Sequence, residues 1–227
     1  MESTIKVEDL KIFDHIDSRV AIVVTDSVAG YNGVLHVFMN NKTLSAWLTE
    51  KRTDYPDLDF KYVEDYLGTA VNFIIENKFD GLSVHSVVEN SFDVSREDLL
   101  PLTDVTNSFL LLSKFNHGKI SIAELTALMR DKSIYFIGSL PQKGEIMTNK
   151  DMVFGLTLIK RKVHDDEYEA LTAFLTPESA RSFADKDVPV SSRKLAEFAA
   201  FAGIFGPIIL EPQRQFSVEF SPIAFLR

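Results

Sequence analysis

The chain of 227 residues contains no cysteine. This absence excludes disulfide bonds, and it excludes every metal site or catalytic nucleophile that depends on a thiolate. A chain without cysteine suits a reducing compartment. Its first residues, MESTIKVEDL, have neither the basic start nor the apolar core of a secretory signal. We therefore expect a cytoplasmic protein.

Long apolar runs are lacking as well. The longest such stretch, Leu195–Leu210, contains Glu197, two glycines and Pro207. It is shorter than the roughly 20 apolar residues that a membrane-spanning helix needs. We expect a buried helix followed by a buried strand there, and no contact with a membrane.

Excess charge is confined to the first part of the chain. Residues 1–100 hold 18 acidic and 9 basic side chains, whereas residues 101–227 hold 15 of each. An acidic surface repels phosphate backbones, so we expect no binding to nucleic acid. The acidic residues gather between Asp54 and Asp65. Solubility is the simpler explanation, and the alternative is a docking face for a basic partner. This candidate interaction face comprises Asp54, Asp57, Asp59, Glu64 and Asp65.

Motifs that would announce catalysis or cofactor binding are absent. The sequence has no G-x-S-x-G, no G-x-G-x-x-G and no phosphate-binding loop. None of its five histidines has a second one at helical spacing, and His36 and His85 alternate with apolar residues as rim or outward-facing strand residues would. The cluster His164-Asp165-Asp166-Glu167 is best explained as a solvated turn. We predict no catalytic residue, cofactor or metal site, and hence no enzyme.

A repeat determines the expected fold. Residues 35–48, LHVFMNNKTLSAWL, correspond at a constant offset to residues 171–184, LTAFLTPESARSFA. The offset pairs Phe38 with Phe174 and Trp47 with Phe183, so the repeated features are core and cap residues. The prediction is an α+β protein made of two tandem copies of a small β-sheet unit with packed helices. We expect the first, acidic copy at 1–102 and the second at 103–227, where two helices lead in.

The expected elements follow the same plan in both copies. In the first copy, residues 20–25 and 34–39 are expected to form paired strands, followed by a short helix capped by Asn40 or Asn41. A longer helix is expected to carry Val63, Tyr66, Leu67, Ala70 and Ile74 on its inner face. In the second copy, Ser191 or Ser192 is expected to cap the corresponding helix. The inner face of its second lead-in helix is expected to consist of Ile122, Leu125, Leu128 and Met129.

Four blocks of the second copy carry a family resemblance: AELTALMRDKSIYFIG, LTAFLTPESARSFA, VPVSSRKLAEFAA and the ending GPIILEP…FSV. Through them the second copy resembles the SseB-like domain family. The first copy resembles the same domain through LHVFMNNKTLSAW and FDGLSVHSVVENSFDVSREDL, with Asn40-Asn41-Lys42 in place of Thr-Pro-Glu. The resemblance implies a small bacterial α+β domain of unassigned biochemistry, and no functional residue is carried over from it.

Together these features favour a non-enzymatic tandem-domain protein that binds another protein. If the acidic face is a docking face, that partner is basic at the contact. The alternative is a small-molecule sensor with a pocket between the two copies. A homo-oligomer is compatible with either function.

Overall fold

The computed structural model describes residues 12–25, 33–77, 79–86, 91–140, 155–163, 166–184, 188–202 and 205–225. The chain divides into two compact units, Met1–Leu110 and Leu111–Arg227, and both combine helices with β-sheet. The α+β class expected from the sequence is confirmed. The division lies inside helix α5 (Thr103–Asn116), further along the chain than the expected boundary at residue 102.

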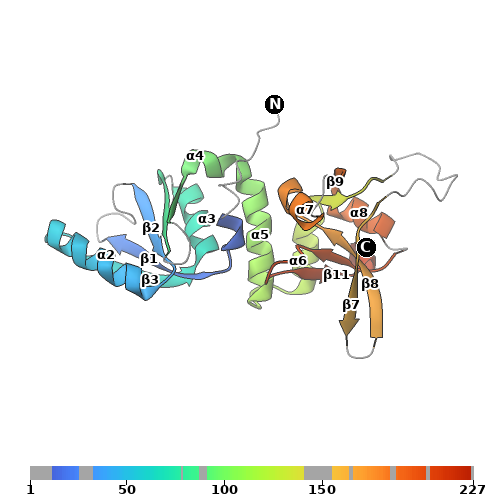
Figure 1. Cartoon of the computed structure of the whole chain (residues 1–227), viewed down its shortest axis with the longest axis horizontal. Helices are drawn as coiled ribbons and strands as arrows, with labels where there is room; N and C mark the ends of the chain where they lie inside the picture. The colour runs from blue at the N-terminus through green and yellow to red at the C-terminus, as the bar shows by residue number, and fades with distance from the viewer. Residues whose placement is uncertain are drawn as a thin grey trace. The chain divides into compact units, whose positions relative to one another are not determined.

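The first unit is built on a five-stranded sheet in the order β3-β1-β2-β4-β5 (Figure 1). Strand β1 is antiparallel to β2 and β3, β2 is parallel to β4, and β4 is antiparallel to β5. The elements in chain order are β1 (Arg19–Thr25), β2 (Val34–Phe38), α2 (Asn41–Asp54), β3 (Phe60–Tyr66), α3 (Leu67–Asn77), β4 (Gly81–His85), β5 (Phe92–Ser95), α4 (Arg96–Leu99) and the 3-10 helix η1 (Leu100–Leu102).

Both faces of this sheet are covered, because side chains alternate along each strand. On one face Phe38 packs with Leu44 and Leu48 of α2 and with Phe60 at the start of β3. Leu35 and Val37 point to the opposite face, and both are buried. Helix α3 contacts β1 to β4 and buries Ala70, Val71 and Ile74, so it covers that face.

The second unit has a four-stranded sheet in the order β11-β10-β8-β7 and a two-stranded sheet of β6 and β9. Strands β7 and β8 form an antiparallel ribbon that extends beyond the rest of this unit (Figure 1). The elements are α6 (Ile122–Met129), β6 (Ser133–Ile137), β7 (Leu158–Val163), β8 (Asp166–Ala173), α7 (Pro177–Ala184), β9 (Val190–Lys194), α8 (Leu195–Ala202), β10 (Ile208–Leu210), β11 (Val218–Phe220) and the 3-10 helix η3 (Pro222–Phe225).

The two units share one strand-pairing scheme. Strand β6 pairs with β9 as β1 pairs with β3, and β8 runs parallel to β10 as β2 runs parallel to β4. Strand β10 is antiparallel to β11, as β4 is to β5. A single bridge between Tyr135 and Phe174 takes the place of the pairing between Ala21 and Phe38. The repeat seen in the sequence is therefore a repeat of topology, to which the second unit adds β7.

The helices that follow β2 and β8 begin in the same way. Asn40 caps α2 by accepting a hydrogen bond from the Thr43 N–H at 2.9 Å. Thr176 caps α7 by accepting one from the Ser179 N–H at 3.1 Å. A side-chain oxygen at this position satisfies a backbone donor that has no partner within the helix. The two caps fix the direction in which each helix leaves its strand.

Two predicted elements are wrong, and they are counterparts of each other. Residues 60–66, expected to be helical in part, form β3, and helix α3 begins only at Leu67. The position where Ser191 or Ser192 was expected to cap a helix is β9, and α8 begins at Leu195. Both strands pair with only one neighbour in the described sheets, and they leave much of their side-chain surface exposed. Neither therefore shows the apolar alternation typical of a half-buried strand.

The predicted inner stripe of α6 is only half correct. Leu125 and Met129 are buried, whereas Ile122 and Leu128 are 44% and 52% exposed. Helix α6 packs against η3 through a narrower face than its apolar content suggests. Ile122 contributes instead to a surface pocket.

Candidate functional site

The predicted acidic residues come from three consecutive segments of the first unit. Asp54 is the last residue of α2, Asp57 and Asp59 lie in the loop, and Glu64 and Asp65 belong to β3. All are exposed except Asp65, which is half-buried. These five acidic side chains follow one another along the chain, and they do not form a cluster around a common binding point.

Several of these carboxylates are engaged locally. Asp54 lies 3.4 Å from the Lys51 ammonium, and Asp59 lies 2.9 Å from the Lys61 ammonium. Asp65 accepts hydrogen bonds from the backbone N–H of Tyr66 at 2.7 Å and from the Thr69 hydroxyl at 3.2 Å. The structure therefore places a charged rim along β3 rather than a chelating cluster.

Strand β3 itself is the more informative feature. It pairs with β1 along all seven residues and forms one border of the described sheet. At its centre the side chains of Tyr62 and Val63 are 47% and 51% exposed. Because side chains alternate along a strand, these two lie on opposite faces of the sheet. The strand thus pairs with a single strand of the described sheet and carries two exposed apolar side chains.

A second constellation lies on the α2 face of the same sheet. His36 on β2 and His85 on β4 approach each other with Nδ1 and Nε2 3.1 Å apart. The His85 ring stacks on Phe38, with ring centroids 4.3 Å apart and planes at 7°. Trp47 of α2 lies 5.0 Å from the His36 ring. The Ser83 hydroxyl is 3.4 Å from His85 Nε2.

The surroundings of the pair disfavour positive charge. Burial and the neighbouring His85 lower the pKa of His36 from 6.5 to about 4. Burial also lowers the pKa of His85, and the nearby Asp93 carboxylate raises it in opposition. Both rings are therefore neutral at neutral pH, and one of the facing nitrogens must carry the hydrogen that the other accepts.

The sequence predicted these two histidines to be rim or outward-facing residues, and the structure instead places them half-buried beside Trp47. Alternation does put His36 and Phe38 on one face of β2, and Ser83 and His85 on one face of β4. The missing information was the parallel pairing of β2 with β4, which joins strands that are not hairpin neighbours. A sequence analysed one hairpin at a time cannot bring them together.

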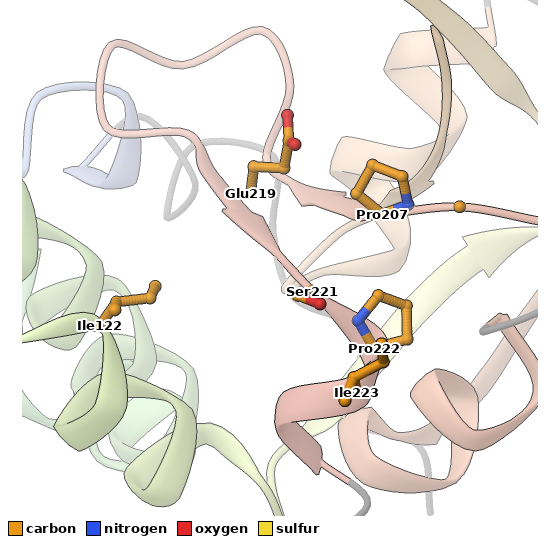
Figure 2. A pocket seen from close by; sticks show the side chains of 7 residues that line it. Ile122, Pro207, Glu219, Ser221, Pro222 and Ile223 are labelled. Atoms are coloured by element: carbon orange, nitrogen blue, oxygen red, sulfur yellow. The ribbon is translucent and has the colours of Figure 1, made fainter.

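The second unit contains a pocket of about 590 Å³. Figure 2 shows Ile122 of α6 facing Ser221, Pro222 and Ile223 across it. Glu219 and Pro207 lie in the upper part of the view, and Gly206 completes the lining. Glu219 accepts a hydrogen bond of 2.7 Å from the Tyr168 hydroxyl, which raises the pKa of Tyr168. The lining is mainly apolar, and it does not bring together an acid, a base and a nucleophile.

Two kinds of feature are absent from the described residues. No group of three or more His, Cys, Asp or Glu side chains is arranged to hold a metal ion. No helix combines the length and the apolar character required to cross a membrane. His164 and Asp165 lie outside the described ranges.

Comparison with known proteins yields little. No family model matches the chain, and no curated protein matches it. One similar solved structure is Anabaena Tic22 (protein transport), with 8% identity over 85% of this chain and 84% of that chain and a TM-score of 0.25. Another is Tic22 from Plasmodium falciparum, with 9% identity over 82% of this chain and 83% of that chain and a TM-score of 0.24. Scores this low carry no argument about this chain.

Proposed function

We propose that this chain is a non-enzymatic, cytoplasmic protein-interaction module, and that its contact surface is the open side of β3. The partner is a protein segment that is extended and rich in Lys or Arg. A basic partner is the one that a docking face on the acidic residues would require. The resemblance to SseB-like domains is a separate prediction.

The observation that supports the proposal is the exposure of the border strand. A border strand presents alternate backbone N–H and C=O groups outward, and an extended peptide can pair with them as an additional strand. Tyr62 and Val63 would add apolar contact on the two faces of the enlarged sheet. Exposed apolar side chains at a border strand favour association unless charges restrict it.

The ends of β3 are already occupied, which limits the length that a partner can pair. The Arg52 guanidinium donates a 3.0 Å hydrogen bond to the Phe60 carbonyl at the start of the strand. At its end the Tyr66 N–H donates to the Asp65 carboxylate. A partner strand therefore pairs along the central residues, 61–65.

The charge around β3 selects the partner. Asp54, Asp57 and Asp59 precede the strand, and Glu64 lies within it with its side chain exposed. Exposed charges act over about 8 Å at physiological ionic strength. They accelerate the approach of a basic segment and repel a second acidic border strand, which protects β3 from pairing with itself.

Binding to designed peptides tests this proposal. A labelled seven-residue peptide of alternating Lys and Val is titrated with the full chain, and fluorescence anisotropy measures its affinity. We expect binding that weakens as salt rises, and no binding to the matched Glu–Val peptide. Hydrogen exchange provides the structural readout, because strand addition should slow exchange of backbone amides within residues 61–65.

Charge-reversal variants distinguish binding at β3 from non-specific electrostatic attraction. Glu64→Lys should weaken binding, and changing Asp54, Asp57 and Asp59 together to Lys should slow association more than it speeds dissociation. The matched control is Glu169→Lys, which should have little effect. Glu169 is also an exposed glutamate on a strand, but it belongs to β8 of the second unit. Binding that is insensitive to both β3-side variants, or unaccompanied by amide protection in β3, would refute the proposal.

A further inference from the structure

The hydrogen bond between His36 and His85 in the first unit depends on the protonation state of the two rings. The facing nitrogens, His36 Nδ1 and His85 Nε2, are 3.1 Å apart. With both rings neutral, or with one proton added, one nitrogen donates and the other accepts. When both rings are protonated, two N–H groups point at each other, so the hydrogen bond is lost and two positive charges are held side by side.

The groups around the pair set the order of protonation. Asp93 on β5 attracts a proton to either ring, and a charge on His85 then opposes protonation of His36. Lys51 on α2 also opposes it, although Glu50 at 2.8 Å and Asp54 at 3.4 Å partly neutralise that ammonium. A coupled pair of this kind takes up protons in two steps that belong to the pair as a whole.

On β1 the residue nearest the pair is uncharged. The antiparallel register pairs Ala21 with Phe38, so Val23 is the β1 residue opposite His36. Val23 is 1% exposed and offers no compensating charge. The charges that act on the pair include Asp93 on β5 and Lys51 on α2.

Trp47 connects the pair to the start of β3. Its ring lies 5.0 Å from His36, 6.5 Å from His85 and 5.5 Å from Phe60, the last in an edge-to-face contact at 88°. Phe60 is the first residue of β3, and its carbonyl accepts the hydrogen bond from Arg52. A displacement of Trp47 would therefore loosen both the packing of α2 and the end of the proposed binding strand.

We propose that the His36–His85 pair is an acid-sensitive clamp that holds Trp47 against the sheet, so that acidification weakens partner binding at β3. The second part of this inference rests on the proposed function of β3. The clamp itself depends only on the geometry of the pair and of Trp47.

The chain offers a direct probe, because Trp47 is its only tryptophan. Its emission is recorded for the full chain between pH 8 and pH 4. We expect a red shift as the pair takes up its protons, because Trp47 moves towards water. In His36→Gln and in His85→Gln this shift should be lost or displaced, since the remaining histidine can still bond to the amide. His117→Gln, which changes a histidine of the second unit, is the matched control and should follow the unmodified chain.

A second measurement needs no variant. Proton and carbon NMR of the histidine rings should show two rings that titrate in linked steps and below the usual range. Emission that is constant from pH 8 to pH 4 in the unmodified chain overturns the clamp. It is equally overturned if His36→Gln and His85→Gln, shown to be folded by circular dichroism at pH 8, titrate like the unmodified chain.

Peptide binding then tests the link to β3. Because the second proton binds near pH 4, affinity for the Lys–Val peptide should fall about twofold more from pH 7.5 to pH 4 in the unmodified chain than in His36→Gln. An equal fall in both proteins would overturn the link. Failure of the peptide to bind at any pH would refute the proposed function of β3 and leave the Trp47 titration as the test of the clamp.

Discussion

Replacement of Phe38 by Ala should reveal how strongly α2 is held to its sheet. Phe38 is 2% exposed, and its ring contacts His85 at 4.3 Å and Trp47 at 5.5 Å between centroids. Removing a buried phenylalanine ring typically costs about 3–5 kcal/mol, and lost ring–ring contacts add about 0.5–1.5 kcal/mol each. We expect the upper half of that 3–5 kcal/mol range for Phe38→Ala. The ring of Phe174, the equivalent residue, lies 5.2 Å from that of Phe183 and is tilted by 50°, so Phe174→Ala should fall in the lower half.

Urea unfolding followed by Trp47 emission measures this cost, because Trp47 reports only on the first unit. With a denaturant dependence of about 2 kcal/mol per molar urea, a loss of about 4 kcal/mol lowers the midpoint by about 2 M. Phe174→Ala should leave the Trp47 transition nearly unchanged and lower a transition seen by circular dichroism. If Phe174→Ala moves the Trp47 transition as far as Phe38→Ala does, the two clusters do not unfold independently and the reasoning fails.

Three further predictions concern individual contacts. Asn40→Ala and Thr176→Ala should each cost about 1 kcal/mol in urea unfolding, because each removes the cap of a helix; a cost near zero for either would contradict its role. Glu211 is 2% exposed and accepts hydrogen bonds from a backbone N–H at 2.7 Å and from a guanidinium at 3.1 Å. Glu211→Ala should cost about 3 kcal/mol, and Glu211→Gln, which keeps an acceptor, less, as measured by thermal unfolding. Gly206 has a φ of +133°, and an added Cβ would lie 2.7 Å from a backbone oxygen. Gly206→Ala should therefore cost about 1–3 kcal/mol of stability. An unchanged melting temperature would argue against this strain.

The sequence was most informative where side chains are buried on one face. The block around Phe38 and its copy around Phe174 carried enough core and cap residues to predict two α+β units. Strand β3 was mistaken for helix because Val63 and Tyr66 lie at helical spacing from Leu67 and Ala70, and β9 because Ser191 and Ser192 are typical cap residues. The identity of both strands depends on pairing with β1 and β6. Local pattern cannot contain information that only a distant strand supplies.

The candidate site also has one part that the sequence revealed and one part that it did not. The acidic residues were visible as composition, and all but Asp65 are exposed, but composition could not reveal that Glu64 and Asp65 lie on a border strand. The histidine pair was not predicted, because His36 and His85 are 49 residues apart and belong to strands joined by a parallel crossover. Features made by chain topology become visible only when that topology is known.

The duplicated clusters differ in a way that bears on evolution and on engineering. In the first unit a small strand residue, Ala21, shares a cluster with a large helix residue, Leu44. In the second unit the sizes are exchanged, since Tyr135 occupies the strand position and Ala180 the helix position. A larger residue at one position thereby offsets a smaller residue at the other, which is how cores tolerate substitution. Chimaeras that transplant α7 onto the first sheet should thus fold only if Ala21 is enlarged at the same time, and related sequences should show these two positions covarying.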